Sequence, residues 1–204
     1  LVSGAPQLGA GAAVGTGQPS GQGWPHLSPS SFLFSLSHPM LAGMERIDDG
    51  DLGIVVAGPT GFGNNVYVVF DKATNEAAFI DAPDGLEVSI AAAELAGVRP
   101  SRILLTHGHF DHTATIDALK GHYDAKLYAH ASEIGLKDGQ LDVPLADGDV
   151  VSVGNLVFSV VHVPGHTVGS VTFVHGAHAF VGDTLFPGGP GRTRLRRPVP
   201  RTPG

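Results

Sequence analysis

Hydrophobic residues between positions 44 and 186 occur in short apolar or alternating runs, which predict a series of β-strands. Each run is rich in β-branched and aromatic residues and is bounded by Gly, Pro, Asp or Asn. The predicted strands cover residues 66–70, 77–80, 103–105, 126–129, 150–153, 156–163, 170–174 and 179–181. The runs at 150–153 and 156–163 flank a Gly-Asn turn and predict a hairpin.

Two longer patterns between these strands predict helices. Asp84, with Glu87 three residues later, resembles a capping box that opens a helix through Leu95, and Gly97 is placed to end it. A second helix is expected over 113–119. Because strands and helices interleave, the sequence predicts the α/β or α+β class.

The two ends of the chain differ in composition from this middle part. Residues 1–43 contain no Asp, Glu, Lys or Arg and are rich in Gly, Pro and Ser, which predicts a disordered leader. Charges first appear after Met44, which we expect to be the physiological start. Residues 187–204 hold five of the 12 Lys and Arg residues and predict a disordered Pro/Arg-rich tail. One domain is therefore expected over 44–186.

Composition narrows the classes of partner. The formal net charge of -7 argues against nucleic acid, which needs Lys and Arg contacts to phosphate. No run approaches the ~20 apolar residues of a membrane helix. The chain has no cysteine, and so neither disulfides nor thiolate ligands. We expect a cytoplasmic protein that acts on a small molecule, with its oligomeric state left open.

The segment that follows the predicted strand 103–105 is rich in metal-ligand residues. It reads Thr-His-Gly-His-Phe-Asp-His from Thr106 to His112. His107 and His109 are two positions apart and can converge on one cation, whereas Asp111 and His112 can turn toward a second. Imidazole and carboxylate without sulfur suit a catalytic zinc or an iron site.

Two later motifs supply further candidate ligands. His166 lies in a Pro-Gly-His-Thr loop between two predicted strands, and Asp183 lies just beyond another strand in Gly-Asp-Thr-Leu-Phe. Each is weak alone, but together with the first cluster they complete a plausible metal shell. Asn64 and Asn65 are interpreted as turn residues. The other histidines of the patterned region are expected to be surface or packed residues: His122, His130, His162, His175 and His178.

These motifs, from about Asn64 to Arg192, resemble the metallo-β-lactamase superfamily, and most closely its glyoxalase II-like branch of small hydrolases. The resemblance implies a four-layer αββα sandwich with two metals, expected to be zinc, between the sheets. It implies that one metal is held by His107, His109 and His166. It implies that the second is held by Asp111 and His112, and that Asp183 bridges both.

The resemblance also implies a reaction. A metal-bound hydroxide would attack an ester or thioester carbonyl, as in hydroxyacylglutathione hydrolases, with Asp111 and Asp183 as the catalytic carboxylates. The cysteine of true zinc β-lactamases is missing from this shell, so antibiotic hydrolysis is less expected.

Two alternatives remain open, because the family continues past the Gly-Asp-Thr-Leu-Phe motif to a final histidine, and no His follows His178 here. We therefore expect the chain to be C-terminally truncated relative to the family. In one alternative, His107, His166 and Asp183 form the two-His, one-carboxylate iron site of a persulfide dioxygenase-like enzyme. In the other, the chain is an inactive fragment of the fold.

Overall fold

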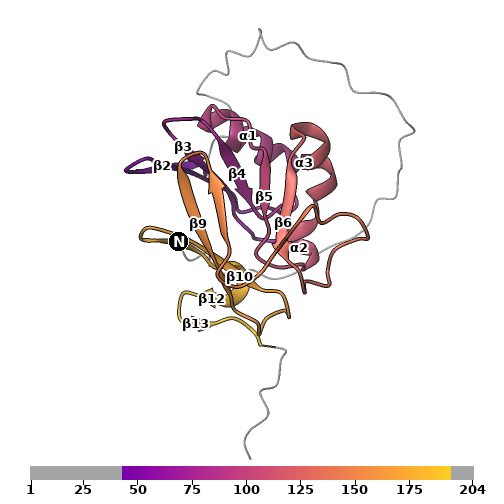
Figure 1. Cartoon of the computed structure of the whole chain (residues 1–204). Helices are drawn as coiled ribbons and strands as arrows, with labels where there is room; N and C mark the ends of the chain where they lie inside the picture. The colour runs from indigo at the N-terminus through magenta and orange to yellow at the C-terminus, as the bar shows by residue number, and fades with distance from the viewer. Residues whose placement is uncertain (1–42, 194–204) are drawn as a thin grey trace, which may run out of the picture.

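Two β-sheets lie face to face in the computed structural model, which describes residues 43–193 (Figure 1). The first sheet contains seven strands in chain order. They are β1 (Glu45–Asp49), β2 (Leu52–Ala57), β3 (Val66–Asp71), β4 (Ala77–Ile80), β5 (Arg102–Leu104), β6 (Lys126–His130) and β7 (Val143–Leu145). Neighbours from β1 to β4 are antiparallel, and those from β4 to β7 are parallel.

The second sheet is a four-stranded antiparallel meander in the order β11-β10-β9-β8. Its strands are β8 (Val150–Val153), β9 (Leu156–His162), β10 (Val171–His175) and β11 (His178–Phe180). A 3-10 turn, η2 (Gly182–Thr184), follows β11. The short hairpin of β12 (Leu185–Phe186) and β13 (Gly189–Pro190) comes next.

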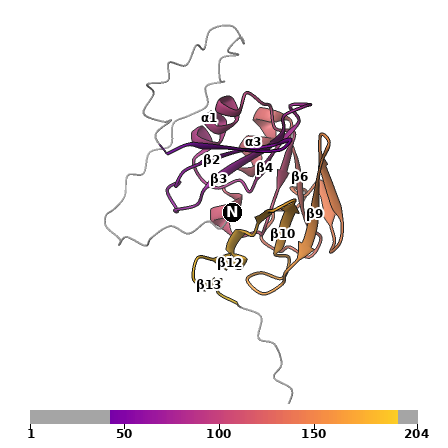
Figure 2. The same ribbon diagram turned by 90° about the vertical axis from the view of Figure 1, so that its left-hand side faces the viewer.

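Helices connect the parallel strands of the first sheet. The helix α1 (Leu86–Ala96) joins β4 to β5, and α2 (Phe110–Thr113) and α3 (Ile116–Tyr123) join β5 to β6. Figure 2 shows α1 and α3 on the face of the first sheet that is turned away from β9. The first sheet is thus covered on both faces, and the fold is the mixed α/β class that the sequence predicted.

The alternation of side chains along β3 divides the interior into two cores. Val66, Val68 and Phe70 point toward the helices, and Val69 points toward the second sheet. The core between the sheets includes Phe158, which is fully buried. Apolar residues at nearly every position of a strand are typical of a sheet that is buried on both sides.

The second sheet buries only one face within the described residues. Its strand β9 alternates buried and exposed positions, and Val150, Val157 and Val161 are exposed on the outer side. The helix layer, the first sheet and the second sheet are three of the four layers that the family resemblance implies.

Every predicted strand is present, with bounds shifted by at most two residues, but β1, β2, β7, β12 and β13 were not predicted. The sequence of β1 is Glu-Arg-Ile-Asp-Asp, an exposed edge strand whose polar residues hide the usual period. β7 has only three residues, with a proline at the centre. Both strands form because a neighbouring strand supplies backbone partners.

Two helix predictions were wrong in detail. The N-cap of α1 is Gly85, with φ 85°, and Asp84 makes no capping bond. Its carboxylate instead accepts a hydrogen bond from Thr60 Oγ1 at 2.6 Å, because the loop before β3 folds back over it. The single helix expected over 113–119 is divided into α2 and α3 around Thr115. Gly97 ends α1 as predicted, with φ 72° and its N–H bonded to the last turn.

Residues 187–193, the beginning of the expected tail, are described and include β13. Our predictions for 1–42 and for 194–204 lie outside the described residues. Among the described helices, none combines the length and apolar character needed to cross a membrane. The domain boundaries stay predictions.

Candidate metal centre

The predicted ligands meet where loops of the two sheets come together. His107 and His109 follow β5, at the carboxyl end of a parallel strand. His166 lies in the loop between β9 and β10, and Asp183 lies in η2 directly after β11. Asp111 and His112 lie in α2. The fold therefore brings all six predicted site residues to one place.

The first ligand group consists of three imidazoles. His107 Nε2 lies 3.1 Å from His109 Nδ1, which lies 2.8 Å from His166 Nε2. Zinc–nitrogen bonds of ~2.0–2.1 Å in a tetrahedron separate the ligand atoms by about 3.3 Å. The three ring nitrogens are thus close to the spacing that one zinc-sized cation requires, and the residues fit a metal.

The other ring nitrogens of two of these histidines have partners that fix the rings. Thr106 Oγ1 lies 3.1 Å from His107 Nδ1, and His166 Nδ1 lies 2.9 Å from the carbonyl oxygen of Arg192, to which it can donate. Such outer partners orient the ligand rings around a metal. Burial, reinforced by nearby His112, lowers the pKa of His107 to about 2, so its imidazole is neutral and available as a ligand.

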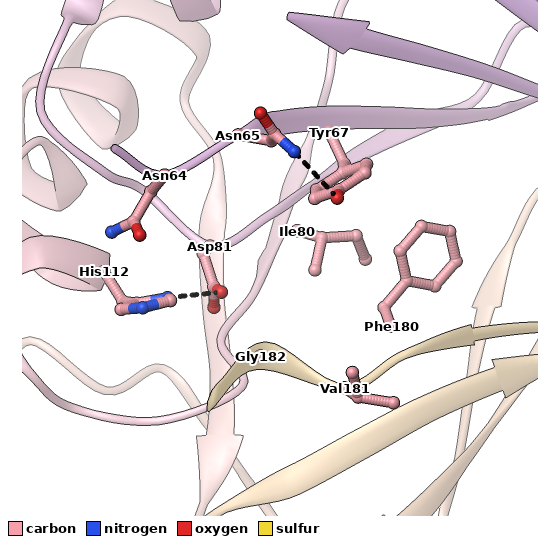
Figure 3. A pocket seen from close by; sticks show the side chains of 9 residues that line it. All are labelled: Asn64, Asn65, Tyr67, Ile80, Asp81, His112, Phe180, Val181 and Gly182. Carbon is pink, nitrogen blue, oxygen red and sulfur yellow. Dashed lines mark hydrogen bonds and ion pairs between the residues drawn. The ribbon is translucent and has the colours of Figure 1, made fainter. Parts of the chain in front are cut away.

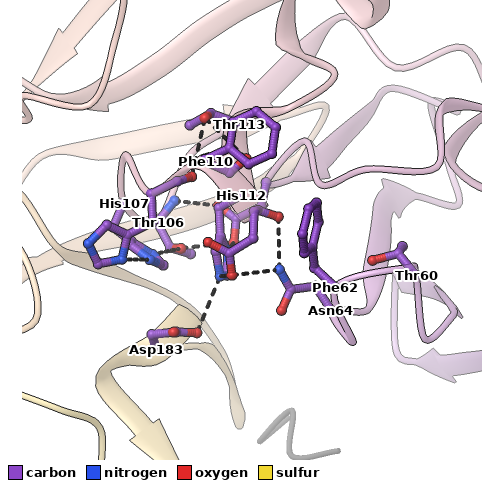
Figure 4. A network of polar contacts seen from close by, with 12 residues as sticks. Thr60, Phe62, Asn64, Thr106, His107, Phe110, His112, Thr113 and Asp183 are labelled. Carbon is purple, nitrogen blue, oxygen red and sulfur yellow. Dashed lines mark hydrogen bonds and ion pairs between the residues drawn. The ribbon is translucent and has the colours of Figure 1, made fainter. Parts of the chain in front are cut away.

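The second group surrounds His112. Its Nε2 is buried and makes no hydrogen bond, although Asp183 Oδ1 lies 3.3 Å away and Asp111 Oδ2 lies 3.6 Å away. Figure 4 shows Asn64 and Asp183 turned toward His112 from two sides. A buried, unsatisfied ring nitrogen facing two carboxylates is the arrangement expected of a cation ligand.

Asp183, a member of the second group, also faces the first group. Its Oδ2 lies 3.5 Å from His166 Nε2, while its Oδ1 faces His112. Burial alone would raise the pKa of Asp183, but the contact with His112 and the nearby imidazoles lowers it below the usual range. The carboxylate is thus ionised and presents one oxygen to each group, as a bridging ligand would.

Asp81 is the main site residue that the sequence analysis missed. It is 7% exposed and has a left-handed backbone with φ 62°, directly after β4. Its carboxylate accepts from Thr106 N at 2.7 Å and Thr106 Oγ1 at 2.8 Å, and lies 2.8 Å from His112 Nδ1. This is a carboxylate–histidine pair behind a metal ligand. An acid at the carboxyl end of a buried strand was the available signal.

The carboxylates of Asp81 and Asp183 also set the protonation of His112. Burial favours the neutral imidazole, but the negative charges of Asp81 and Asp183 outweigh burial and raise the pKa of His112 to about 10. In the metal-free protein this imidazole is therefore protonated at neutral pH, and the proton occupies the second group.

Asn64 does more than form the expected turn. Its Nδ2 donates to the backbone oxygen of Asp111 at 2.8 Å and to Asp111 Oδ2 at 3.2 Å. These bonds fix a carboxylate that is 37% exposed and lies at the open side of the centre.

A pocket opens beside the second group, between the ends of β3 and β11 (Figure 3). Asn65, Tyr67 and Phe180 line it, and Asn65 Nδ2 donates to the Tyr67 hydroxyl at 3.3 Å. Nearby, the exposed rings of Phe62 and Phe110 meet edge to face with centroids 5.7 Å apart. The centre thus has both polar and aromatic surroundings.

Five histidines were expected to be surface or packed residues and not ligands. Among the described residues, none of the five belongs to either ligand group. His130 and His162 stack with centroids 3.8 Å apart, where β6 approaches β9. His175 bonds the carbonyl of Val157, and His178 pairs with Asp49.

Comparison with known proteins assigns the family. The model of the metallo-beta-lactamase superfamily matches residues 59–204, which is well over half of the chain. The chain therefore belongs to the metallo-β-lactamase superfamily, as its motifs predicted.

The curated relatives that match this chain include hydroxyacylglutathione hydrolases. Hydroxyacylglutathione hydrolase of Pseudomonas fluorescens (strain SBW25) is 38% identical over 129 residues, covering 63% of this chain and 49% of the relative. The chain spans about half the length of the curated relatives it matches.

Two solved structures share the fold. ETHE1 from Myxococcus xanthus has a TM-score of 0.60 and 26% identity, covering 75% of this chain and 62% of that protein. TTHA1623, crystallised in a di-iron-bound form, has a TM-score of 0.57 and 31% identity, covering 69% and 77%.

Proposed function

We propose that this chain is a metal-dependent hydrolase of thioesters or esters, with 2-hydroxyacyl thioesters of glutathione as the substrate class to test first. The observation that supports this most is the position of Asp183. Its two carboxylate oxygens face two adjacent ligand groups, which suits a pair of metals held a few ångströms apart. The hydroxyacylglutathione hydrolase relatives support the choice of a thioester.

A bound metal would polarise the substrate carbonyl and lower the pKa of water toward ~7. The chain's own residues supply the rest of the site. His107, His109 and His166 would hold one metal, and Asp111, His112 and Asp183 the second. Asp111, which is partly exposed and fixed by Asn64, would accept the proton from the attacking water. Asp183 keeps the two groups at a fixed separation.

The rim of the centre supports a small-molecule substrate. Phe62 and Phe110 present an exposed aromatic pair next to the loop of His109, and Asn65 and Tyr67 provide polar groups in the adjacent pocket. Binding sites for small molecules commonly combine apolar walls with a few fixed polar groups. The exposed rings of Phe62 and Phe110 suit contact with the apolar part of an acyl group.

Zinc is the metal proposed first, and an iron enzyme of the persulfide dioxygenase type is the second candidate. One observation favours iron over zinc: TTHA1623, which shares this fold, was crystallised in a di-iron-bound form. In that case His107, His166 and Asp183 would supply the two-His, one-carboxylate set that suits oxygen-activating iron.

Metal analysis and activity together test the proposal. Zinc, iron and manganese per chain are measured in purified protein, followed by hydrolysis of a 2-hydroxyacyl glutathione thioester and of the ester with the same acyl group. Two metals per chain with thioester hydrolysis supports the proposal. One iron with thiol-dependent oxygen uptake supports the second candidate. A chain that binds no metal would contradict both and point to an inactive fragment.

A further inference from the structure

The loop that holds His166 is fastened from the side by the turn after β6, residues 131–135. Thr167 Oγ1 donates to Glu133 Oε2 at 2.6 Å, one residue beyond the ligand. Ser132 Oγ donates to the carbonyl oxygen of Val168 at 3.2 Å. The turn therefore contacts the His166 loop at two consecutive residues.

The same turn lies against the loop of the other two histidines. Gly108 separates His107 from His109, and a Cβ added at Gly135 would lie 1.8 Å from the Gly108 carbonyl oxygen. On the other side, a Cβ added at Gly169 would lie 2.7 Å from the Glu133 Cα. Only glycine permits these approaches, so the turn is wedged between the two loops that supply the first ligand group.

Glu133 is itself held in place. Its second carboxylate oxygen, Oε1, accepts from the backbone N–H of Ile134 at 2.9 Å, while Oε2 accepts from Thr167. Thr167 is in turn held by Ser170, whose Oγ accepts from Thr167 N at 2.9 Å. Hydrogen bonds to an ionised carboxylate are among the stronger ones in proteins. The chain of contacts from the turn to the ligand loop is thus short and stiff.

We propose that Glu133 is a positioning residue for the first metal. Through Thr167 it fixes the distance of His166 from His107 and His109, and so sets the affinity and geometry of that site. The inference rests on the metal centre of the proposed function and does not depend on which substrate is hydrolysed. A purely structural role of Glu133 predicts lower thermal stability, with no change in the geometry of the bound metal.

The test uses the full chain and the variants Glu133→Ala, Thr167→Val and Thr167→Ser, with Glu87→Ala as the matched control. Glu87 is an exposed glutamate in the first turn of α1, on the helix layer. Zinc affinity is measured by competition with a chromophoric chelator. Cobalt substitution reports ligand geometry through its visible absorption.

Glu133→Ala and Thr167→Val are expected to weaken the tighter zinc site about tenfold, within the range for partners behind metal ligands. Both are expected to shift the cobalt spectrum, whereas Thr167→Ser, which keeps the hydroxyl, and Glu87→Ala leave it unchanged. Thr167→Val also removes the 2.8 Å contact between the hydroxyls of Thr167 and Ser170. The double variant Glu133→Ala/Thr167→Val is therefore expected to be no weaker than Thr167→Val alone, because that variant already lacks the Glu133 contact.

Unchanged zinc affinity and an unchanged cobalt spectrum in Glu133→Ala would overturn this inference while leaving the proposed function intact. If Glu133→Ala does not fold, the Val and Ser variants at Thr167 decide, because Val replaces the hydroxyl with a methyl group whereas Ser keeps the hydroxyl. Wild-type protein that binds no metal would overturn the metal centre and this inference together. Failure to hydrolyse thioesters would leave the metal measurements unaffected.

Discussion

The two ligand groups of the candidate centre are neighbours, yet they differ in charge. The first group is three imidazoles, and burial keeps His107 neutral by lowering its pKa to about 2. The second group surrounds His112, whose pKa is raised to about 10 by Asp81 and Asp183 in spite of burial. One group therefore has a ring nitrogen ready for a cation, and the other contains a proton that a cation must displace.

This difference indicates how the candidate centre balances its buried charges. Buried carboxylates without a cation are costly, and the protonated His112 supplies positive charge between them. The first group has no carboxylate among its three imidazoles, and burial keeps His107 neutral. We expect the first metal to bind tightly with little dependence on His107 titration, and the second to bind in exchange for a proton.

Removing a ligand of the first group has the largest expected effect. His107→Ala should lower zinc affinity at the first site by more than the ~100-fold upper range for outer partners, and thioester hydrolysis with it. Elemental analysis after dialysis measures the loss. His122→Ala, an exposed histidine outside both groups, is the control, and a variant that retains its metals would refute the ligand assignment.

The second prediction concerns pH and sharpens the difference between the groups. Below about pH 10 the metal-free protein carries a proton on His112 that must leave, so the affinity of the second metal rises as pH rises. The rise is about tenfold per pH unit, or ~100-fold over two units near neutrality. Calorimetry in buffers of different ionisation enthalpy counts the released protons. Equal proton release by both metals would contradict the comparison.

Asp81→Asn tests the origin of that pH dependence. The amide keeps an acceptor for Thr106 but removes the charge behind His112. At a pH where His112 has lost its proton, the second metal should bind about 10–100-fold more weakly, in the range for partners behind ligands. The pKa of His112 should also fall, which flattens the pH profile. Asp138→Asn, at an exposed position, is the control, and an unchanged profile in Asp81→Asn would assign the high pKa to Asp183 instead.

Asn64→Ala has the smallest expected effect. It removes the donor that fixes Asp111, and the loss of a part-exposed hydrogen bond costs ~1 kcal/mol, or about fivefold in affinity for the second metal. The first metal should bind as before. Asn155→Ala, in the exposed turn between β8 and β9, controls for the loss of an asparagine side chain. Equal weakening of both metals by Asn64→Ala would show that the loop, and not Asp111, is affected.

The strands and the ligand motif were predictable because their signals are local. The alternation and apolar runs fixed the positions of β3 to β6 and β8 to β11, and the spacing of His107, His109 and His112 places three imidazoles on one short loop and helix. The sequence also indicated His166 and Asp183, since each follows a strand in a tight loop. Which oxygen or nitrogen of each side chain meets which ligand group was not predictable.

Contacts between distant segments were decided only by the tertiary structure. Asp81 lies 31 residues from His112, and Glu133 lies 34 residues from Thr167; no local pattern marks either pair. Their partners are set by the parallel pairing of β4 with β5 and by the packing of the turn after β6 against the second sheet. The sequence by itself determined which chemical groups are available and which class of fold presents them. The packing of the two sheets determined their protonation, orientation and separation, because those depend on burial and on charges brought together from elsewhere in the chain.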